Sequence, residues 1–418
     1  MNSVHEMTRR RPALRARVVE ELARRASDLM RLSSEIHRDP ELGCREMHTV
    51  TRLAGELEEE GFDVETGTAG LATAFRAEYS AGGAGPTIAF LCEYDALPGL
   101  GHGGGHNLIA LATHGAALGL SAVLGQIGGR VVVIGAPAEE TIGGKVVLAV
   151  RGAFDDLDVA LLSHPAGESR AIVHSLASWS VEVSFEGRAA HAVTDEGLGI
   201  NALEALIALF NRRGELLAEL GDTFYLPGVI LDGGLRPNLV PDHARARFSL
   251  RAPNTPDLIE KLLPRFKELV ATIANATGAS ASVRTIDNLY DEFLANPVLA
   301  QTWTRHAREA GLDPVAGEGA PMGSLDMGTL SFRIPALHPT FRIADEALAT
   351  HTEAFAAAAI SPRAQREALH AAQAMALTGL ELLTTPELLS RVREAHELRI
   401  VGRKPRIDAP LIDRPPGA

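Results

Sequence analysis

Short apolar runs alternate with helix-periodic segments through the first 165 residues, and this alternation limits the possible folds more than any other feature. The runs at 86–99, 130–140 and 159–165 are typical of buried strands. Apolar positions at helical spacing predict helices at residues 12–36, 46–62, 106–129 and 143–157. Strands separated by helices form a largely parallel sheet with helices on both faces, so we predict an α/β domain.

The pattern changes between residues 174 and 289. Segments there follow in the order strand–helix–strand–strand–helix–strand, which is typical of a small α+β unit. A chain of 418 residues is too long for one compact core, so two domains are expected. We predict a first domain of residues 1–173 and 290–418, with a loosely held tail from about 400 to 418, and an inserted domain at 174–289.

Charge and cysteine content narrow the function classes. The net charge of −13 argues against a nucleic-acid or anionic-membrane partner, because both need clustered Lys and Arg. The apolar runs are too short to span a bilayer, and no apolar stretch of a signal peptide follows the basic N-terminal segment. The two cysteines, Cys44 and Cys92, exclude a disulfide scaffold and fit a reducing compartment. We therefore expect a cytoplasmic protein.

Polar residues stand at the C-terminal ends of three predicted strands. Asp95 follows the first, Glu139 and Glu140 the second, and His164 the third. Carboxyl ends of parallel strands meet at one edge of a sheet, so these loops are expected to converge. Of two adjacent carboxylates in extended chain, one can bind a metal while the other acts as general base. An acidic helix N-terminus is the alternative interpretation of this pair.

Four residues are candidate metal ligands: His106, Glu140, His164 and His351, the last at the start of a predicted helix. Each histidine taken alone is more often an ordinary polar residue. Imidazole together with carboxylate favours zinc, manganese or cobalt. The placement of all four at loop ends predicts a shared site for a divalent metal.

Three residues of the inserted domain are candidates for contact with substrate. His191 is either a surface histidine or a donor that stabilises a developing oxyanion. Asn238 and Arg251 are candidates for holding a substrate carboxylate, although Arg251 also fits an ordinary position on a strand surface. The chain lacks the G-x-S-x-G and P-loop spacings, which argues against a serine hydrolase and a phosphate-binding loop.

Taken in order, these stretches resemble metallopeptidase family M20, and in particular its branch of N-acyl-amino-acid amidohydrolases. The aminobenzoyl-glutamate hydrolase subunit and related dipeptidases are the closest in motif. The matching segments are IHRDPELGCRE, CEYDALPGLGHGGGHNLIA, GAPAEETIGGK, GAFDDLDVALLSHP, FEGRAAHA, GGLRPNLVPD, GSLDMGTLSFRIPALHP and HTEAF. They span residues from about 36 to 355, which is nearly the whole globular chain.

The resemblance implies a zinc-peptidase-like catalytic domain with a two-metal site and a lid domain that forms a homodimer. It implies hydrolysis of the amide bond in an N-acyl amino acid or a small dipeptide. By motif position, Glu139 corresponds to the general base, and the metal ligands correspond to His106, Glu140, His164 and His351. Asp95 corresponds to an acid that orients the ligands from behind. His191 corresponds to the oxyanion donor, supplied by the lid of the partner subunit.

The loop GHGGGHN, residues 101–107, departs from the pattern of this family. The family carries Cys at the position of Gly104 and shares its thiolate between two metals. Loss of this anionic ligand is expected to weaken binding of the second metal. Three outcomes follow: two metals with water or His102 filling the gap, one metal that still supports hydrolysis, or no metal. Thr329 and Glu196, where the family usually has Asn and Pro, are lesser departures.

We predict a hydrolase, because the adjoining glutamates, the ligand imidazoles and His191 are all present. The alternative is a metal-depleted relative that forms or rearranges an amide in the same pocket, which the loss of the thiolate at Gly104 motivates. A dimeric protein that only binds an amino-acid conjugate is a third class, and it ranks last, since a pure binder has no need of a base carboxylate beside a metal ligand.

Overall fold

The computed structural model describes residues 2–195, 197–317, 319, 323–345, 347–403 and 411–413. Contacts within the chain divide it into two compact units. Unit 1 comprises Met1–His174, Phe293–Met322 and Thr329–Pro405, and unit 2 comprises Ser175–Glu292, Gly323–Gly328 and Arg406–Ala418. The segment Gly323–Gly328 belongs to unit 2 although it is distant in sequence, and its Gly323 carbonyl accepts from Leu176 N at 2.8 Å.

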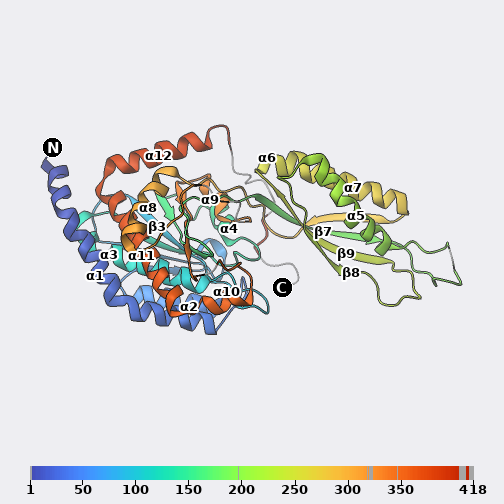
Figure 1. Cartoon of the computed structure of the whole chain (residues 1–418), viewed down its shortest axis with the longest axis horizontal. Coiled ribbons are helices and arrows are strands. Elements are labelled where there is room, and N and C mark those ends of the chain that lie inside the picture. Colours follow the sequence, from blue (N-terminus) through green and yellow to red (C-terminus); the bar gives the residue numbers. More distant parts are fainter. Residues whose placement is uncertain are drawn as a thin grey trace. The chain divides into compact units, whose positions relative to one another are not determined.

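A six-stranded sheet forms the centre of unit 1 (Figure 1). Its strands are β1 (Asp63–Thr66), β2 (Phe75–Ser80), β3 (Thr87–Cys92), β4 (Arg130–Gly135), β5 (Val159–Leu161) and β11 (Ala336–Leu337), in the order β1-β2-β4-β3-β5-β11. The four strands β4, β3, β5 and β11 are parallel, whereas β1 and β2 are antiparallel. The predicted α/β class is confirmed, with an antiparallel edge that the alternation did not predict.

The predicted strand at 159–165 is wrong in one respect, because it is two strands. β5 ends at Leu161, and β6 (His164–Ala166) begins after a break. β6 leaves the large sheet and pairs in parallel with β12 (Thr340–Arg342) in a sheet of two strands. His164 therefore begins a strand instead of ending one.

Helix α3 packs at the centre of unit 1, against α1, α11, β3 and β4 (Figure 1). The helices outside the inserted region are α1 (Asn2–Arg38), α2 (Met47–Glu59), η1 (Thr68–Gly70), α3 (His106–Ile127), α4 (Gly144–Val150), α8 (Pro297–Ala310), α9 (Met327–Ser331), α10 (Glu353–Ala358), α11 (Pro362–Thr384) and α12 (Pro386–Ile400). A Cβ at Gly115 of α3 would lie 2.9 Å from Ala372 Cβ and 3.2 Å from Leu22 Cδ2. Glycine thus lets α3 approach both neighbouring helices closely.

By length and composition, α3 is also apolar enough to cross a membrane, and it is the one such helix among the described residues. Within the structure, 83% of its most apolar window is buried. The core helix of a globular unit passes the same test, so the apolar character of α3 is explained by its packing.

Unit 2 contains a four-stranded antiparallel sheet and two long helices (Figure 1). Its elements are β7 (Ala177–Glu186), α5 (Ala202–Leu220), β8 (Gly228–Asp232), β9 (His243–Ala252), α6 (Thr255–Asp257), η2 (Leu258–Leu262), α7 (Leu263–Thr277) and β10 (Ser280–Thr285), with the strand order β10-β7-β9-β8. Asn201 Oδ1 accepts from the Leu203 and Glu204 amides at 3.0 and 3.2 Å and so begins α5. The predicted α+β order of elements is confirmed.

The predicted C-terminal tail is described only in part. Helix α12 ends at Ile400, and farther along Ile412 exchanges two hydrogen bonds of 2.8 Å with the side chain of Asn288 in unit 2. Residues 404–410 and 414–418 of that tail, and Glu196, lie outside the described residues.

Candidate active site

Candidate side chains meet at the carboxyl ends of the parallel strands of unit 1. Asp95 follows β3, and Glu139 and Glu140 follow β4, the parallel neighbour of β3. His106 is the first residue of α3, and His164 is the first residue of β6. Neighbouring parallel strands end at the same edge, which is why loops distant in sequence come together here.

The carboxylate of Asp95 joins two of these loops. His106 Nδ1 donates to the Asp95 backbone oxygen at 2.8 Å and lies 3.1 Å from its Oδ1. The other carboxylate oxygen, Oδ2, accepts from the backbone N–H of Glu140 at 3.0 Å. Because the Nδ1 proton of His106 is directed to Asp95, its Nε2 lone pair is presented to the site, as metal ligation requires.

The expectation of extended chain at Glu139 and Glu140 is wrong, because the chain turns there. Ala138 has a φ of +59°, and the amide of Gly143 donates to the Ala138 carbonyl at 2.9 Å. The turn does not send the two carboxylates to opposite sides, since ligand atoms of both lie within 4.8 Å of a ring nitrogen of His106. Both glutamates therefore reach the same site.

Glu46, which no sequence motif singles out, holds the start of this turn. Its Oε1 accepts from the Ala138 backbone N–H at 2.8 Å, and the side chain is fully buried. Burial, and then the negative charge of Asp95, raise the pKa of Glu46 from 4.5 to about 8. The folded protein thus favours the neutral carboxyl group at this position.

A raised pKa makes the stability contributed by Glu46 depend on pH. That contribution is present below pH 4.5 and is lost as the pH rises through about 8, because the folded state must then bury a charge. We expect Glu46→Gln, which keeps the acceptor for Ala138, to gain thermal stability relative to the unmodified protein between pH 5 and pH 9. Melting curves of both proteins across this range measure the difference, and a constant difference would contradict the prediction.

His351 reaches the same cluster from the C-terminal part of unit 1. It precedes α10, which begins at Glu353, so the expectation that His351 opens a helix is wrong by two residues. Its φ is +62°, and its backbone N–H donates to the Gly103 carbonyl at 2.9 Å. The ring Nε2 lies 3.0 Å from Glu140 Oε1. The turn at His351 thus brings the ring back to the loop that carries the glutamates.

Two groups of side chains could each hold a metal ion, and they share His106. The groups are Glu93, His106 and His164, and His106, Glu139 and Glu140, with the ligand atoms of each within 4.8 Å of one another. Donors bound to a tetrahedral ion lie roughly 3.4 Å apart. His106 Nε2 is 3.5 Å from Glu93 Oε2 and 4.0 Å from Glu140 Oε1. These donors therefore fit a divalent metal in type and spacing.

The electrostatic field of the cluster favours cations. Burial lowers the pKa of His106, but the hydrogen bond and charge of Asp95, followed by Glu93 and Glu140, outweigh it and raise the pKa to about 10. Burial also lowers the pKa of His164, which favours the neutral ring. A field that attracts a proton to a buried imidazole also attracts a metal ion, which must displace that proton to bind.

Two buried residues beside the cluster were missed by sequence reasoning. Glu93 directly follows β3, and its Oε1 lies 2.6 Å from the fully buried Nζ of Lys145. Burial raises the pKa of Glu93, but the charge of Lys145 and then that of His106 outweigh it and hold the pKa below its ordinary value. Glu93 directly precedes the predicted loop that carries Asp95, so its position was the available signal.

His338 was also missed. Its ring stacks on that of His164 with centroids 5.5 Å apart, and burial lowers its pKa to about 3. Among the described residues, neither of its ring nitrogens has a hydrogen-bond partner. His338 thus supports His164 by ring contact.

Gly104 lies between the two groups of ligands. A Cβ built there would be 2.8 Å from Glu140 Oε1 and 3.1 Å from His106 Nε2, so a side chain at this position would enter the donor cluster. His102 does not fill the gap, because its Nε2 is directed to the Ile36 carbonyl at 3.1 Å. The absence of a side chain at position 104 therefore removes a possible ligand from the middle of the cluster.

His191 and Asn238 lie side by side in unit 2. The Ala192 amide donates to the Asn238 carbonyl at 3.1 Å, and both His191 and Asn238 are at least partly exposed. His191 Nδ1 accepts from the amides of Val193 and Thr194, each at 3.2 Å. In the neutral ring the proton is then on Nε2, which makes this nitrogen a donor.

Arg251 lies at the other end of β9 from Asn238. It pairs across the sheet with Ser178, whereas the opposite end of β9, His243, pairs with Glu186. Eight residues of strand separate the two ends by roughly 26 Å. Within one chain, Arg251 and Asn238 therefore do not bind the same substrate group.

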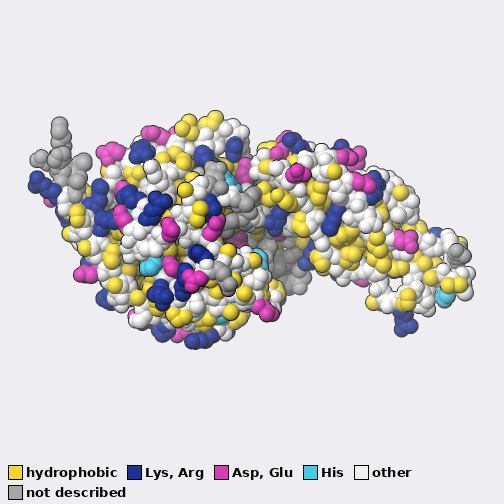
Figure 2. Space-filling view, viewed as in Figure 1, with side chains coloured by type: hydrophobic (Ala, Val, Ile, Leu, Met, Phe, Trp, Pro, Cys, Tyr) yellow, Lys and Arg dark blue, Asp and Glu magenta, His cyan; other side chains and the backbone are white. Residues whose placement is uncertain are grey.

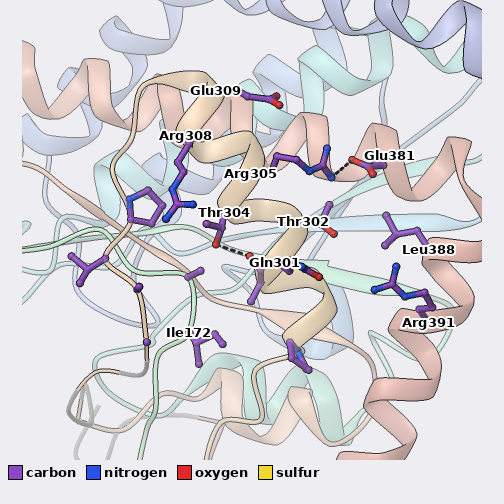
Figure 3. A pocket seen from close by; sticks show the side chains of 17 residues that line it. Ile172, Gln301, Thr302, Thr304, Arg305, Arg308, Glu309, Glu381, Leu388 and Arg391 are labelled. Carbon is purple, nitrogen blue, oxygen red and sulfur yellow. Dashed lines mark hydrogen bonds and ion pairs between the residues drawn. The ribbon is translucent and has the colours of Figure 1, made fainter.

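A hollow of about 820 Å³ lies beside α8 and contains none of the predicted site residues (Figure 3). Arg305 and Glu381 form an ion pair of 2.6 Å at its wall, and Arg308 and Arg391 also line it. It offers neither adjoining carboxylates nor a histidine, so the chemistry belongs to the cluster at the strand ends.

Comparisons with known proteins agree with this geometry. The peptidase dimerisation domain matches residues 175–278. The chain is 36% identical to a mouse Xaa-Arg dipeptidase over 407 residues, which cover 93% of each chain. The chain belongs to the M20 family of peptidases.

Other members of the M20 family support this assignment. A p-aminobenzoyl-glutamate hydrolase of Escherichia coli is 32% identical in one of its subunits over 295 residues, covering 64% of this chain and 59% of the other. The fold is shared with a dinuclear metal-binding M20 peptidase of Bacillus subtilis at a TM-score of 0.64 and 20% identity, covering 86% of this chain and 98% of the other. This M20 chain is thus a hydrolase of amide bonds, and none of these relatives favours the amide-forming alternative.

Proposed function

We propose that this chain is a cytoplasmic metal-dependent peptidase that hydrolyses the amide bond of a small dipeptide or an N-acyl amino acid. The observation that carries the proposal is the meeting of Glu139, Glu140, His106 and His351 with the buried Glu93 and His164 in one cluster. The names of the mouse and Escherichia coli relatives, a dipeptidase and an aminobenzoyl-glutamate hydrolase, support this substrate class.

The residues of the cluster divide the work. His106, Glu140, His164 and His351 hold zinc, manganese or cobalt, as one ion or two. A bound ion makes water more acidic and polarises the substrate carbonyl. Glu139 accepts the proton of the attacking water and returns it to the leaving amine. Asp95 keeps His106 and the Glu140 loop in place through hydrogen bonds of 2.8 and 3.0 Å.

Residues of unit 2 complete the site in this proposal. His191 donates from Nε2 to the carbonyl oxygen as negative charge develops there, and its Nδ1 is already held by two backbone amides. Asn238 binds the substrate beside it. The partner subunit of a homodimer supplies both residues. Arg251, at the far end of β9, binds a different part of the substrate.

Metal removal tests the proposal directly. We expect turnover of a panel of dipeptides, including Xaa-Arg, and of N-acyl amino acids to fall below detection after chelation. Manganese, cobalt or zinc should restore it, because the cluster has no other electrophile to polarise the carbonyl. Elemental analysis before and after chelation follows the metal. Turnover that is indifferent to the chelator in metal-free protein would contradict the proposal.

An exposed apolar strand supports a homodimer. β8 is the edge of the sheet of unit 2, and its Val229, Ile230 and Leu231 are 56%, 43% and 41% exposed. Figure 2 shows hydrophobic side chains gathered on unit 2 around this strand. An unpaired apolar edge pairs readily with a second copy of itself.

A charge on this edge should separate the subunits. We expect Val229→Asp to shift the protein from dimer to monomer, because the carboxylate would be buried without a partner at the interface. Light scattering coupled to gel filtration measures the mass. Leu398→Asp, at a 77% exposed position of α12, is the control that should stay dimeric. A dimeric Val229→Asp protein would exclude β8 as the interface.

A further inference from the structure

One oxygen of Glu93 is buried without a partner. Among the described residues, Oε2 has no hydrogen-bond partner, whereas Oε1 lies 2.6 Å from Lys145 Nζ. The side chains of Glu93 and Lys145 are 1% and 0% exposed. A buried carboxylate oxygen that accepts no hydrogen bond is costly, so a native structure that keeps one has a reason such as an ion.

The unpartnered oxygen faces two ring nitrogens that also carry lone pairs. Glu93 Oε2 is 3.5 Å from His106 Nε2 and 4.0 Å from His164 Nε2. Nδ1 of His106 donates to Asp95, and Nδ1 of His164 donates to the Pro165 carbonyl at 2.7 Å. In the neutral rings both Nε2 atoms are therefore acceptors. Three acceptors directed at one point repel each other unless a cation lies between them.

Charge explains why this carboxylate matters in a chain with Gly104. Without an anionic side chain at position 104, the pair His106 and His164 offers an ion only neutral nitrogen. Glu93 Oε2 is the carboxylate oxygen grouped with both of these rings within 4.8 Å. Two imidazoles and one carboxylate form a common three-ligand set for a catalytic zinc ion.

We propose that Glu93 is a metal ligand and completes, with His106 and His164, a site that binds a divalent ion without a residue at position 104. Lys145 holds the other oxygen of Glu93 and so fixes the direction of Oε2. The inference rests on the proposed function, because it assumes that the cluster binds metal. The alternative is that Glu93 and Lys145 form only a structural ion pair.

Metal titration separates these possibilities without reference to activity. Wild-type protein and Glu93→Gln are stripped with chelator and titrated with zinc against a chromophoric competitor, and their melting curves are compared. We expect Glu93→Gln to bind this ion at least roughly tenfold more weakly, or to lose one ion per chain. Glu182→Gln is the matched control, since Glu182 is a buried glutamate of unit 2 paired with Arg247 and Arg284 and should leave zinc binding unchanged.

A second pair of variants guards against misfolding and adds a gain of binding. Glu93→Gln combined with Lys145→Met removes both charges of the buried pair, so it leaves no unpaired ammonium and should still bind zinc weakly. Glu93→Gln combined with Gly104→Cys should recover zinc affinity, because a thiolate then enters the cluster. The Cβ at position 104 is crowded mainly by the flexible end of Glu140.

The outcomes are distinct. Unchanged zinc stoichiometry and affinity in folded Glu93→Gln overturn this inference and leave the proposed function intact. A wild-type protein that binds no zinc, manganese or cobalt overturns both. Should the variants not fold, a zinc-loaded wild-type crystal measured at the zinc edge decides. An anomalous peak about 2 Å from Glu93 Oε2 supports the inference, and zinc bound only elsewhere overturns it.

Discussion

Replacement of Glu139 by glutamine is expected to lower kcat by roughly 10²–10⁴-fold, the contribution of a positioned general base. Glutamine has nearly the same size but cannot accept the proton of the attacking water. Metal content should stay at the wild-type level, because Glu140 and the histidines remain. Steady-state kinetics on a cleaved dipeptide, with elemental analysis of the same samples, measure both quantities.

The neighbouring position provides the control for this experiment. Glu140→Gln should lose metal as well as activity, since Glu140 Oε1 lies 3.0 Å from His351 Nε2 and 4.0 Å from His106 Nε2. The pair of variants thus separates proton transfer from metal binding within one turn of the chain. Full activity of Glu139→Gln would remove Glu139 from the mechanism.

Replacement of His191 by alanine is expected to lower kcat by roughly 10²–10³-fold, the usual effect of removing one oxyanion donor. Metal content and the dimer should be unaffected, because the side chain is exposed and belongs to unit 2. His191→Gln, which can also donate, should retain more activity than alanine. Kinetics of the three proteins measure this order, and equal kcat values would exclude the donor role.

Mixing two inactive proteins tests whether His191 acts in the partner subunit. When Glu139→Gln and His191→Ala chains are unfolded together and refolded, about half of the dimers are mixed. If His191 serves the partner's site, each mixed dimer has one complete site, and about a quarter of wild-type activity returns. If His191 serves its own subunit, every site stays defective. A mixture without activity would therefore contradict the exchange between subunits.

Periodicity and strand-end residues predicted much of this molecule. The buried runs became β3, β4 and β5, and the polar residues after them, Asp95, Glu139 and Glu140, lie in one cluster with His106 because parallel strands end together. His351 joined them only through the resemblance, since no local pattern relates it to the earlier loops. Such matches between local pattern and site arise where strand order decides the geometry.

Features that depend on pairing across long sequence distances were not predictable. β6 leaves the sheet because β12, far along the chain, pairs with it. The turn at Ala138 depends on its positive φ and on the buried Glu46 beneath it, and neither is visible in local composition. Glu93 looks like one polar residue at the end of a strand. Its importance is visible only once Lys145 and the two imidazoles are placed around it.

The late position of β11 in the sequence affects how this protein is made. β11 pairs with β5, yet all of the inserted region is translated between Leu161 and Ala336. At roughly 5–20 residues per second, the ribosome needs on the order of ten to thirty seconds to cover that distance. During this interval the nascent sheet carries an open flank at β5, and His351 has not yet emerged. Loading of the complete cluster is therefore post-translational, and the growing chain depends on chaperones to shield that flank.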